Sequence, residues 1–291
     1  MKAVCFFGLI RSFAKNINGI IKNIIEPNNP DIFICTSIYD NHKTRFKVDH
    51  EQNLNIDDIT NILSNAFGQK LKGLYIYDNN SDNVNIKDAR FKKIAKVLEL
   101  KKAYETTNNF IYDTVAIHRL DVIFCPWDIC DKYYDDRVVE EEREKGLVKI
   151  NNTPIGVKNH GCCSIQICPN IDEISTIINL PENMNDNTIG CYEDYWIGHV
   201  LIDFAYGNSR VMDIYGLFYE KCIKNNNLII NPQFKKNKTT SLQSYEGYSD
   251  WYNYSKQTSA ETQLKLYLMQ NNIINYIQLR RMIDIGVLYI R

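Results

Sequence analysis

The chain has 291 residues, of which 44% are hydrophobic, so it can bury a sizeable core as one large domain or two small ones. Its 34 basic and 35 acidic side chains give a formal charge of -1, and no long basic patch is present, which argues against a nucleic-acid partner. No segment approaches the roughly 18 apolar residues of a membrane span, and Arg11 interrupts the apolar start before it could form a signal peptide. The nine cysteines, an odd number scattered through apparent core strands, indicate a reducing compartment. We therefore expect a soluble, cytoplasmic protein.

Strand and helix patterns alternate along the first half of the chain. The predicted strands cover residues 3–8, 31–36, 71–77 and 112–124. The predicted helices cover residues 12–24, 57–66 and 88–104. Three strand–helix units followed by a fourth strand predict an α/β fold, a Rossmann-like α/β/α sandwich around a mostly parallel, doubly wound sheet. Such sheets bind ligands outside the carboxyl ends of their strands.

The second half is less regular. We expect strands at 147–150 and 163–167, a polar loop at 183–188 and irregular chain at 223–258. Helical spacing predicts helices at 172–178, 193–204 and 260–282. No linker rich in Pro, Gly or Ser divides the chain, so we expect one domain, 1–291, with a regular half at 1–125 and a less regular half at 126–291.

Arg119 and Asp121 stand near the end of the predicted strand 112–124, two positions apart and so on one side of it. Burying both charges in a core would be costly, which favours their placement at a strand end that faces a site. A carboxylate there can hold a divalent metal, and an arginine can grip a phosphate. Both would suit a nucleotide-diphosphate donor. The alternative is an internal ion pair that closes the sheet edge, and this stretch alone does not decide between them.

Two polar groups follow the first two predicted strands. After the first, Gly8 would let the backbone approach a ligand, and Arg11 could contact a phosphate or a base. An ordinary strand-to-helix turn is the alternative. After the second, the hydroxyl of Thr36 could bond a ribose or a base edge, although plain turn chemistry is favoured there.

Glu193 and Asp194 begin the predicted helix 193–204. A helix amino terminus stabilises carboxylates, so capping is one interpretation. The other is a carboxylate aimed into a cleft as a general base, among aromatic side chains that suit sugar stacking.

Together these motifs resemble a nucleotide-sugar glycosyltransferase of the GT-A type. The chain is similar to the small cytoplasmic transferases of giant viruses and of bacterial capsule gene clusters. The resemblance spans about residues 3 to 204 and depends on the order and spacing of Phe6–Phe13, Asp31–Thr36, Tyr112–Asp113, Arg119–Asp121 and Glu193–Trp196.

The resemblance implies a GT-A-like fold whose first half, 1–125, binds the nucleotide and whose second half, 126–291, faces the acceptor. The nucleotide-binding residues would be Gly8, Leu9, Arg11, Thr36 and Arg119. The donor would be a UDP- or GDP-linked sugar, and the acceptor would be the hydroxyl group of a glycan or of another molecule.

The same resemblance assigns the chemistry. Asp121 would match the last aspartate of an Asp-x-Asp element that holds Mn²⁺ or Mg²⁺ on the donor diphosphate. Asp194, with Glu193 beside it, would deprotonate the acceptor in an inverting transfer. The chain departs from the pattern where Arg119 replaces the first aspartate of the element, so Arg119 could itself neutralise diphosphate charge.

Two alternatives stay open. One is a catalytically inactive nucleotide- or glycan-binding module of the same fold, because the Asp-x-Asp element lacks its first aspartate. The other is a sugar nucleotidyltransferase, an enzyme that usually carries a glycine-rich loop with a lysine, and that loop is missing after the first strand here.

Overall fold

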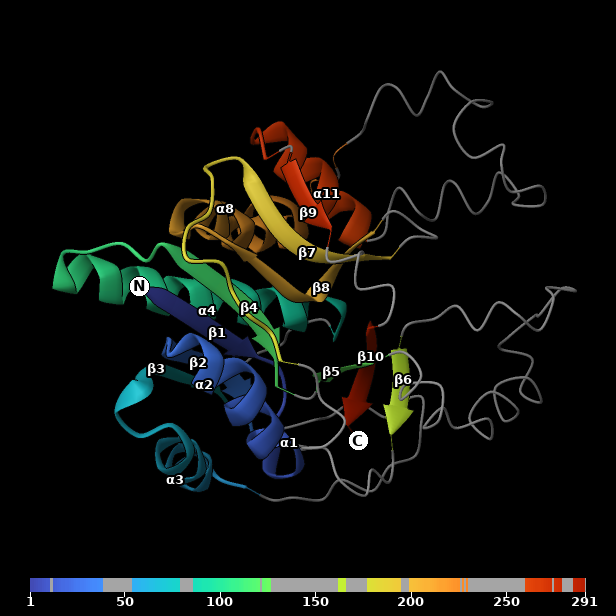
Figure 1. Cartoon of the computed structure of the whole chain (residues 1–291). Helices are drawn as coiled ribbons and strands as arrows, with labels where there is room; N and C mark the ends of the chain where they lie inside the picture. Colours follow the sequence, from blue (N-terminus) through green and yellow to red (C-terminus); the bar gives the residue numbers. More distant parts are fainter. Residues whose placement is uncertain are drawn as a thin grey trace, which may run out of the picture.

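The computed structural model describes residues 1–10, 13–38, 54–78, 86–120, 122–126, 162–165, 177–194, 199–225, 227, 229, 260–273, 275–278 and 285–290. Its main sheet has the strand order β3-β2-β1-β4-β8-β7-β9 (Figure 1). In that order the strands are β3 (Leu71–Tyr77), β2 (Asp31–Ser37), β1 (Lys2–Phe7), β4 (Thr114–Arg119), β8 (His199–Gly207), β7 (Thr188–Asp194) and β9 (Asn275–Gln278).

All neighbours in this sheet pair in parallel except at β8, which is antiparallel to both β4 and β7. The predicted α/β fold with a mostly parallel sheet is therefore confirmed. Because β8 reverses direction, β7 runs parallel to β1 and β4, and the carboxyl ends of all three strands lie at one edge of the sheet.

Helices cover both faces of the sheet. One face carries α1 (Phe13–Ile20), the π-helical turn η1 (Ile21–Ile25) with α2 (Glu26–Asn28), and α3 (Ile56–Phe67) with the short 3₁₀ turn η2 (Gly68–Lys70). The other face carries α4 (Ile86–Asn108), α8 (Ser209–Phe218) with the π-helical turn η3 (Tyr219–Ile223), and α11 (Ala260–Gln270). None of the helices in the described part of the chain is long and apolar enough to cross a membrane.

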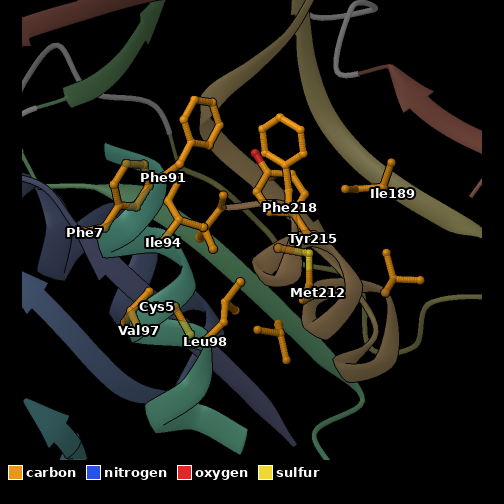
Figure 2. Close-up of a cluster of buried hydrophobic side chains, with 14 of the residues drawn as sticks. Cys5, Phe7, Phe91, Ile94, Val97, Leu98, Ile189, Met212, Tyr215 and Phe218 are labelled. Atoms are coloured by element: carbon orange, nitrogen blue, oxygen red, sulfur yellow. The ribbon is translucent and has the colours of Figure 1, made fainter. Parts of the chain in front are cut away.

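The two cores follow from strand alternation. In β1, Val4 and Phe6 belong to the core under α1 and α3, while Cys5 and Phe7 belong to the core under α4 and α8. Figure 2 shows the second core, with Phe91 of α4 and neighbouring side chains packed against those of α8. A strand buried on both faces reads as a continuous apolar run, which is why β1 could be predicted from its sequence.

Residues 112–124 form two strands where the sequence predicted one. β4 ends at Arg119, and β5 (Val122–Pro126) belongs to a second sheet, in which β10 (Ile285–Ile290) pairs antiparallel with β5 and parallel with β6 (Cys162–Ile165). Figure 1 shows this small sheet beyond the carboxyl ends of β1 and β4. The main sheet therefore passes directly into the small one at this edge.

The predicted helix 193–204 is wrong, because this stretch contains the end of β7 and the start of β8. Val200, Leu201 and Phe204 do recur at helical spacing. However, β8 lies inside the sheet, and periodicity cannot separate a strand buried on both faces from a buried helix. Glu193 and Asp194 thus stand at a strand end, where Asp194 pairs with His199 across the hairpin.

The predicted helix 260–282 is correct only in its first half. α11 ends at Gln270, the Ile273 amide donates to the Leu268 carbonyl, and Asn272 adopts a left-handed φ of 62°. This is a common helix stop, and Asn tolerates it better than most residues. The strand β9 follows.

The remaining predictions have mixed outcomes. The expected strand 147–150 lies outside the described residues, as do most of 172–178 and 223–258. Residues 177–187 are without regular secondary structure, which agrees with the expected loop at 183–188 except at Thr188, the first residue of β7. The end of the expected helix 172–178, residues 177 and 178, is not helical. No helix was predicted where α8 lies, and its first turn is capped by the side chain of Asn208, whose Oδ1 accepts from the Val211 amide at 2.8 Å.

Candidate functional site

The candidate site lies at the carboxyl ends of β1 and β4. Gly8 follows β1 with φ at 122°, a conformation that side-chain-bearing residues rarely adopt, and its amide donates to the Cys35 carbonyl of β2. On the other side of β1, the Leu120 amide donates to the Phe7 carbonyl at 2.9 Å. The chain therefore leaves β1 through a backbone position that only glycine occupies easily, with β2 and β4 fixed beside it.

Arg119, the last residue of β4, forms an ion pair with Asp203 of the adjacent strand β8. Its Nη1 lies 3.1 Å from Asp203 Oδ1, and Arg90 Nη1 of α4 lies 3.7 Å from the same oxygen. Side-chain exposure is 4% for Asp203, 19% for Arg119 and 34% for Arg90. A buried carboxylate thus lies between two arginines that both reach the surface.

Two guanidinium groups therefore meet at one carboxylate at this edge. A guanidinium is always protonated, and its planar shape suits phosphate oxygens. The sequence predicted Arg119 at a strand end. The structure adds Asp203 as its partner, so the ion pair spans two strands.

Asp203 lies where β8 departs from regular pairing with β7. Cys191 pairs with Ala205 and Glu193 pairs with Val200, so two steps along β7 match five steps along β8. Irregular pairing of this kind bends a strand and re-aims its side chains, and it is frequent beside active sites. The irregularity contains Asp203.

The first turns of α4 add further basic side chains at this edge. The buried Lys93 donates to Ser37 Oγ, at the end of β2, at 2.7 Å. Lys92 lies over the ring of Tyr77, at the end of β3, 4.6 Å from its centroid. Because α4 returns the chain from β3 to β4, its amino terminus and the positive end of its dipole lie at the carboxyl edge.

The remaining site residues predicted from the sequence lie apart from the Arg119–Asp203–Arg90 cluster or outside the described residues. Leu9 follows Gly8 and is half-buried. Thr36 is fully buried in β2, and within the described part of the chain its Oγ1 has no hydrogen-bond partner. Arg11 and Asp121 lie outside the described residues. The backbones of Glu193 and Asp194 end β7 at the same edge as Gly8 and Arg119, two strands away from β4.

No group of three His, Cys, Asp or Glu side chains that could hold a metal ion occurs within the described part of the chain. Asp203 is already engaged by two arginines, which does not suit a cation ligand. The Mn²⁺ or Mg²⁺ site expected at Asp121 stays a prediction, because Asp121 is not among the described residues.

Sequence reasoning missed Asp203 and Arg90. A signal for Asp203 does exist, because it is the single charge in the apolar run Val200–Tyr206. A charge inside a buried strand needs a partner, and Arg119 on the neighbouring strand supplies it. Arg90 had no comparable signal, since a basic residue near a helix start is common.

Comparison with known proteins does not identify a family. No protein-family model matches the chain, and no curated protein matches it significantly. Any function must therefore be argued from the residues at the carboxyl edge.

Proposed function

We propose that the chain is a glycosyltransferase that moves a sugar from a nucleotide-diphosphate donor to a hydroxyl acceptor at the carboxyl edge of the main sheet. The observation that carries the proposal is the Arg119–Asp203–Arg90 cluster beside the β1–Gly8 turn. The positive-φ glycine suits close approach of a ligand to the backbone, and the cluster holds two partly exposed guanidinium groups of the kind that bind a diphosphate.

The sheet supports the proposal at the level of the fold. The resemblance to GT-A-type transferases implies a Rossmann-like, mostly parallel sheet, and the sheet of this chain meets that expectation. In open α/β sheets of this kind, ligands bind outside the carboxyl ends of the strands. Arg119 and Gly8 occupy such ends on adjacent strands.

In the proposed reaction, the acceptor oxygen attacks the anomeric carbon, and the bond from that carbon to the diphosphate oxygen breaks. Asp194 takes the acceptor proton as general base. Arg119 and Arg90 stabilise the negative charge that develops on the leaving diphosphate. Mn²⁺ or Mg²⁺ at Asp121, where bound, would supply further charge neutralisation.

Binding and turnover separate the proposal from its alternatives. UDP or GDP at millimolar concentration should raise the melting temperature, because a ligand of the folded state stabilises it by mass action. Nucleotide sugars should then be hydrolysed or transferred. An inactive binding module would bind nucleotide without turnover, and a nucleotidyltransferase would require a nucleoside triphosphate and a sugar phosphate.

The donor site has a matched control in the chain. Arg119→Ala should weaken nucleotide binding even in EDTA, because its contact is with phosphate. Arg210→Ala removes an exposed arginine at the start of α8, at the opposite edge of the sheet, and should leave binding unchanged. If no nucleoside diphosphate shifts the melting temperature of the parent, the proposed function fails.

A further inference from the structure

Asn16 is a polar residue on the side of α1 that packs against the sheet. It is fully buried, and its Nδ2 donates to the carbonyl oxygen of Leu120 at 3.1 Å and to that of Val122 at 3.2 Å. These two residues flank Asp121 in the chain. An amide nitrogen carries two hydrogens, so this one side chain provides one donor for each carbonyl.

Packing alone does not explain an asparagine at this position. The neighbouring core residues of α1, Phe13 and Ile20, are apolar, and an apolar side chain would fit the same environment. The Oδ1 of Asn16 has no hydrogen-bond partner among the described residues, and burying it in that state is unfavourable. What an apolar side chain could not provide is the pair of hydrogen bonds to the turn between β4 and β5.

The helix that carries Asn16 also holds the other loop of the proposed donor site. The Phe13 amide, at the start of α1, donates to the Ile10 carbonyl at 2.8 Å. This bond ties the first turn of α1 to the loop that begins at Gly8. Asn16 follows three residues after Phe13, so the two attachments lie within about one helical turn.

We propose that Asn16 is a positioning residue that couples the two loops of the donor site. Through its two hydrogen bonds it holds both flanks of Asp121 at a fixed place relative to the loop after β1. This inference rests on the proposed function, because it assigns a role in binding a nucleoside diphosphate at that edge. Asn16 itself does not touch the ligand.

The chain offers a matched control at the opposite edge of the sheet. Asn28 is also buried, at 7% exposure, and its Nδ2 donates to the carbonyls of Ile24 at 2.8 Å and Ile178 at 2.7 Å. Its Oδ1 accepts from the Leu180 amide at 2.7 Å. It lies in α2, just before β2 begins, so its loss should reduce stability without reaching the proposed site.

The test measures the dissociation constants of UDP and GDP by calorimetry, for the full chain, at a temperature where circular dichroism shows every variant folded. Asn16→Ala should bind the nucleotide about tenfold more weakly, a change of about 1.4 kcal/mol. Asn16→Ser should be intermediate, because a hydroxyl donates only one hydrogen bond. Asn28→Ala should bind within about twofold of the parent although it melts at a lower temperature.

The outcomes are distinguishable. If both Asn16 variants bind like the parent, Asn16 is only a structural residue and the inference is overturned; Asn16→Ser alone decides this if Asn16→Ala does not fold. Equal loss of affinity in Asn28→Ala would also overturn it, since general softening would then explain the effect. If the parent binds neither nucleotide, the proposed function itself fails, and the role of Asn16 fails with it.

Discussion

Replacing Asp203 by Asn tests the charge cluster most directly. The change keeps the size of the side chain and removes the negative charge between Arg119 and Arg90. Removing one partner of a buried ion pair costs about 3–5 kcal/mol when both groups are desolvated. Here the two arginines keep 19% and 34% of their side-chain surface exposed, so water can partly replace the lost partner. We therefore expect about 2 kcal/mol of lost stability.

Thermal unfolding measures this loss, which for a chain of 291 residues corresponds to a fall in melting temperature of about 3 °C. Nucleotide affinity should fall as well, because Arg119 loses the group that orients it. Glu220→Gln is the control: its partner Lys224 and Glu220 itself are about half exposed, and such pairs contribute little. A melting temperature unchanged in Asp203→Asn would show that the cluster does not hold Arg119 as described.

Three further predictions concern catalysis, the β1 turn and the buried thiols. Asp194→Asn should lower the rate of sugar transfer by a factor of about 10² to 10⁴, with donor affinity little changed. Glu193→Gln should have a smaller effect, because adjacent residues of a strand face opposite sides. If Glu193→Gln lowers the rate more than Asp194→Asn does, the two residues exchange roles. Gly8→Ala should cost about 1–3 kcal/mol in chemical denaturation, because φ at 122° is unfavourable for alanine, and parent-like stability would contradict this. Burial raises the pKa of Cys35 to about 12 and also raises that of Cys5, so the folded protein keeps protons that the unfolded chain loses above its ordinary pKa of 9.0. The contribution of each protonated thiol to the free energy of unfolding is therefore complete below about pH 9 and declines toward about pH 12, by about 1.4 kcal/mol per pH unit. Alkaline denaturation of Cys35→Ala measures this contribution, and a profile that matches the parent's would refute it.

The parallel half of the fold could be predicted from sequence because each of its elements carries a strong local signal. β1 is a short apolar run that ends in glycine. The helix α3 begins with acidic residues, and the structure adds a capping box in which Asn55 and Asp58 bond each other's backbone amides at 2.8 and 3.1 Å. Where several such signals mark one element, its predicted bounds match the observed bounds to within a few residues.

The antiparallel part could not be predicted, for a physical reason. β8 is buried on both faces by helices and neighbouring strands, so its sequence lacks the polar alternation that marks a half-buried strand. Trp196 and Ile197 extended its apolar residues into an apparent helical stripe. The error changed the local setting of Asp194 from a helix start to a strand end. Because β7 runs parallel to β1, Asp194 stands at the same edge of the sheet as Gly8.

The pairing of Arg119 with Asp203 also bears on the proposed function, because the Asp-x-Asp element of GT-A-type transferases would place an aspartate at position 119. An aspartate at position 119 would lie one residue beyond the His118–Phe204 pair, close to Asp203 on the adjacent strand, and like charges on neighbouring strands repel each other. The arginine at position 119 instead forms an ion pair with Asp203, and Arg90 of α4 forms a second ion pair with the same carboxylate. The two positions therefore depend on each other: a carboxylate on β8 favours a cation at the end of β4. In the proposed function, these guanidinium groups would neutralise the negative charge of the diphosphate, because they stay protonated at every physiological pH.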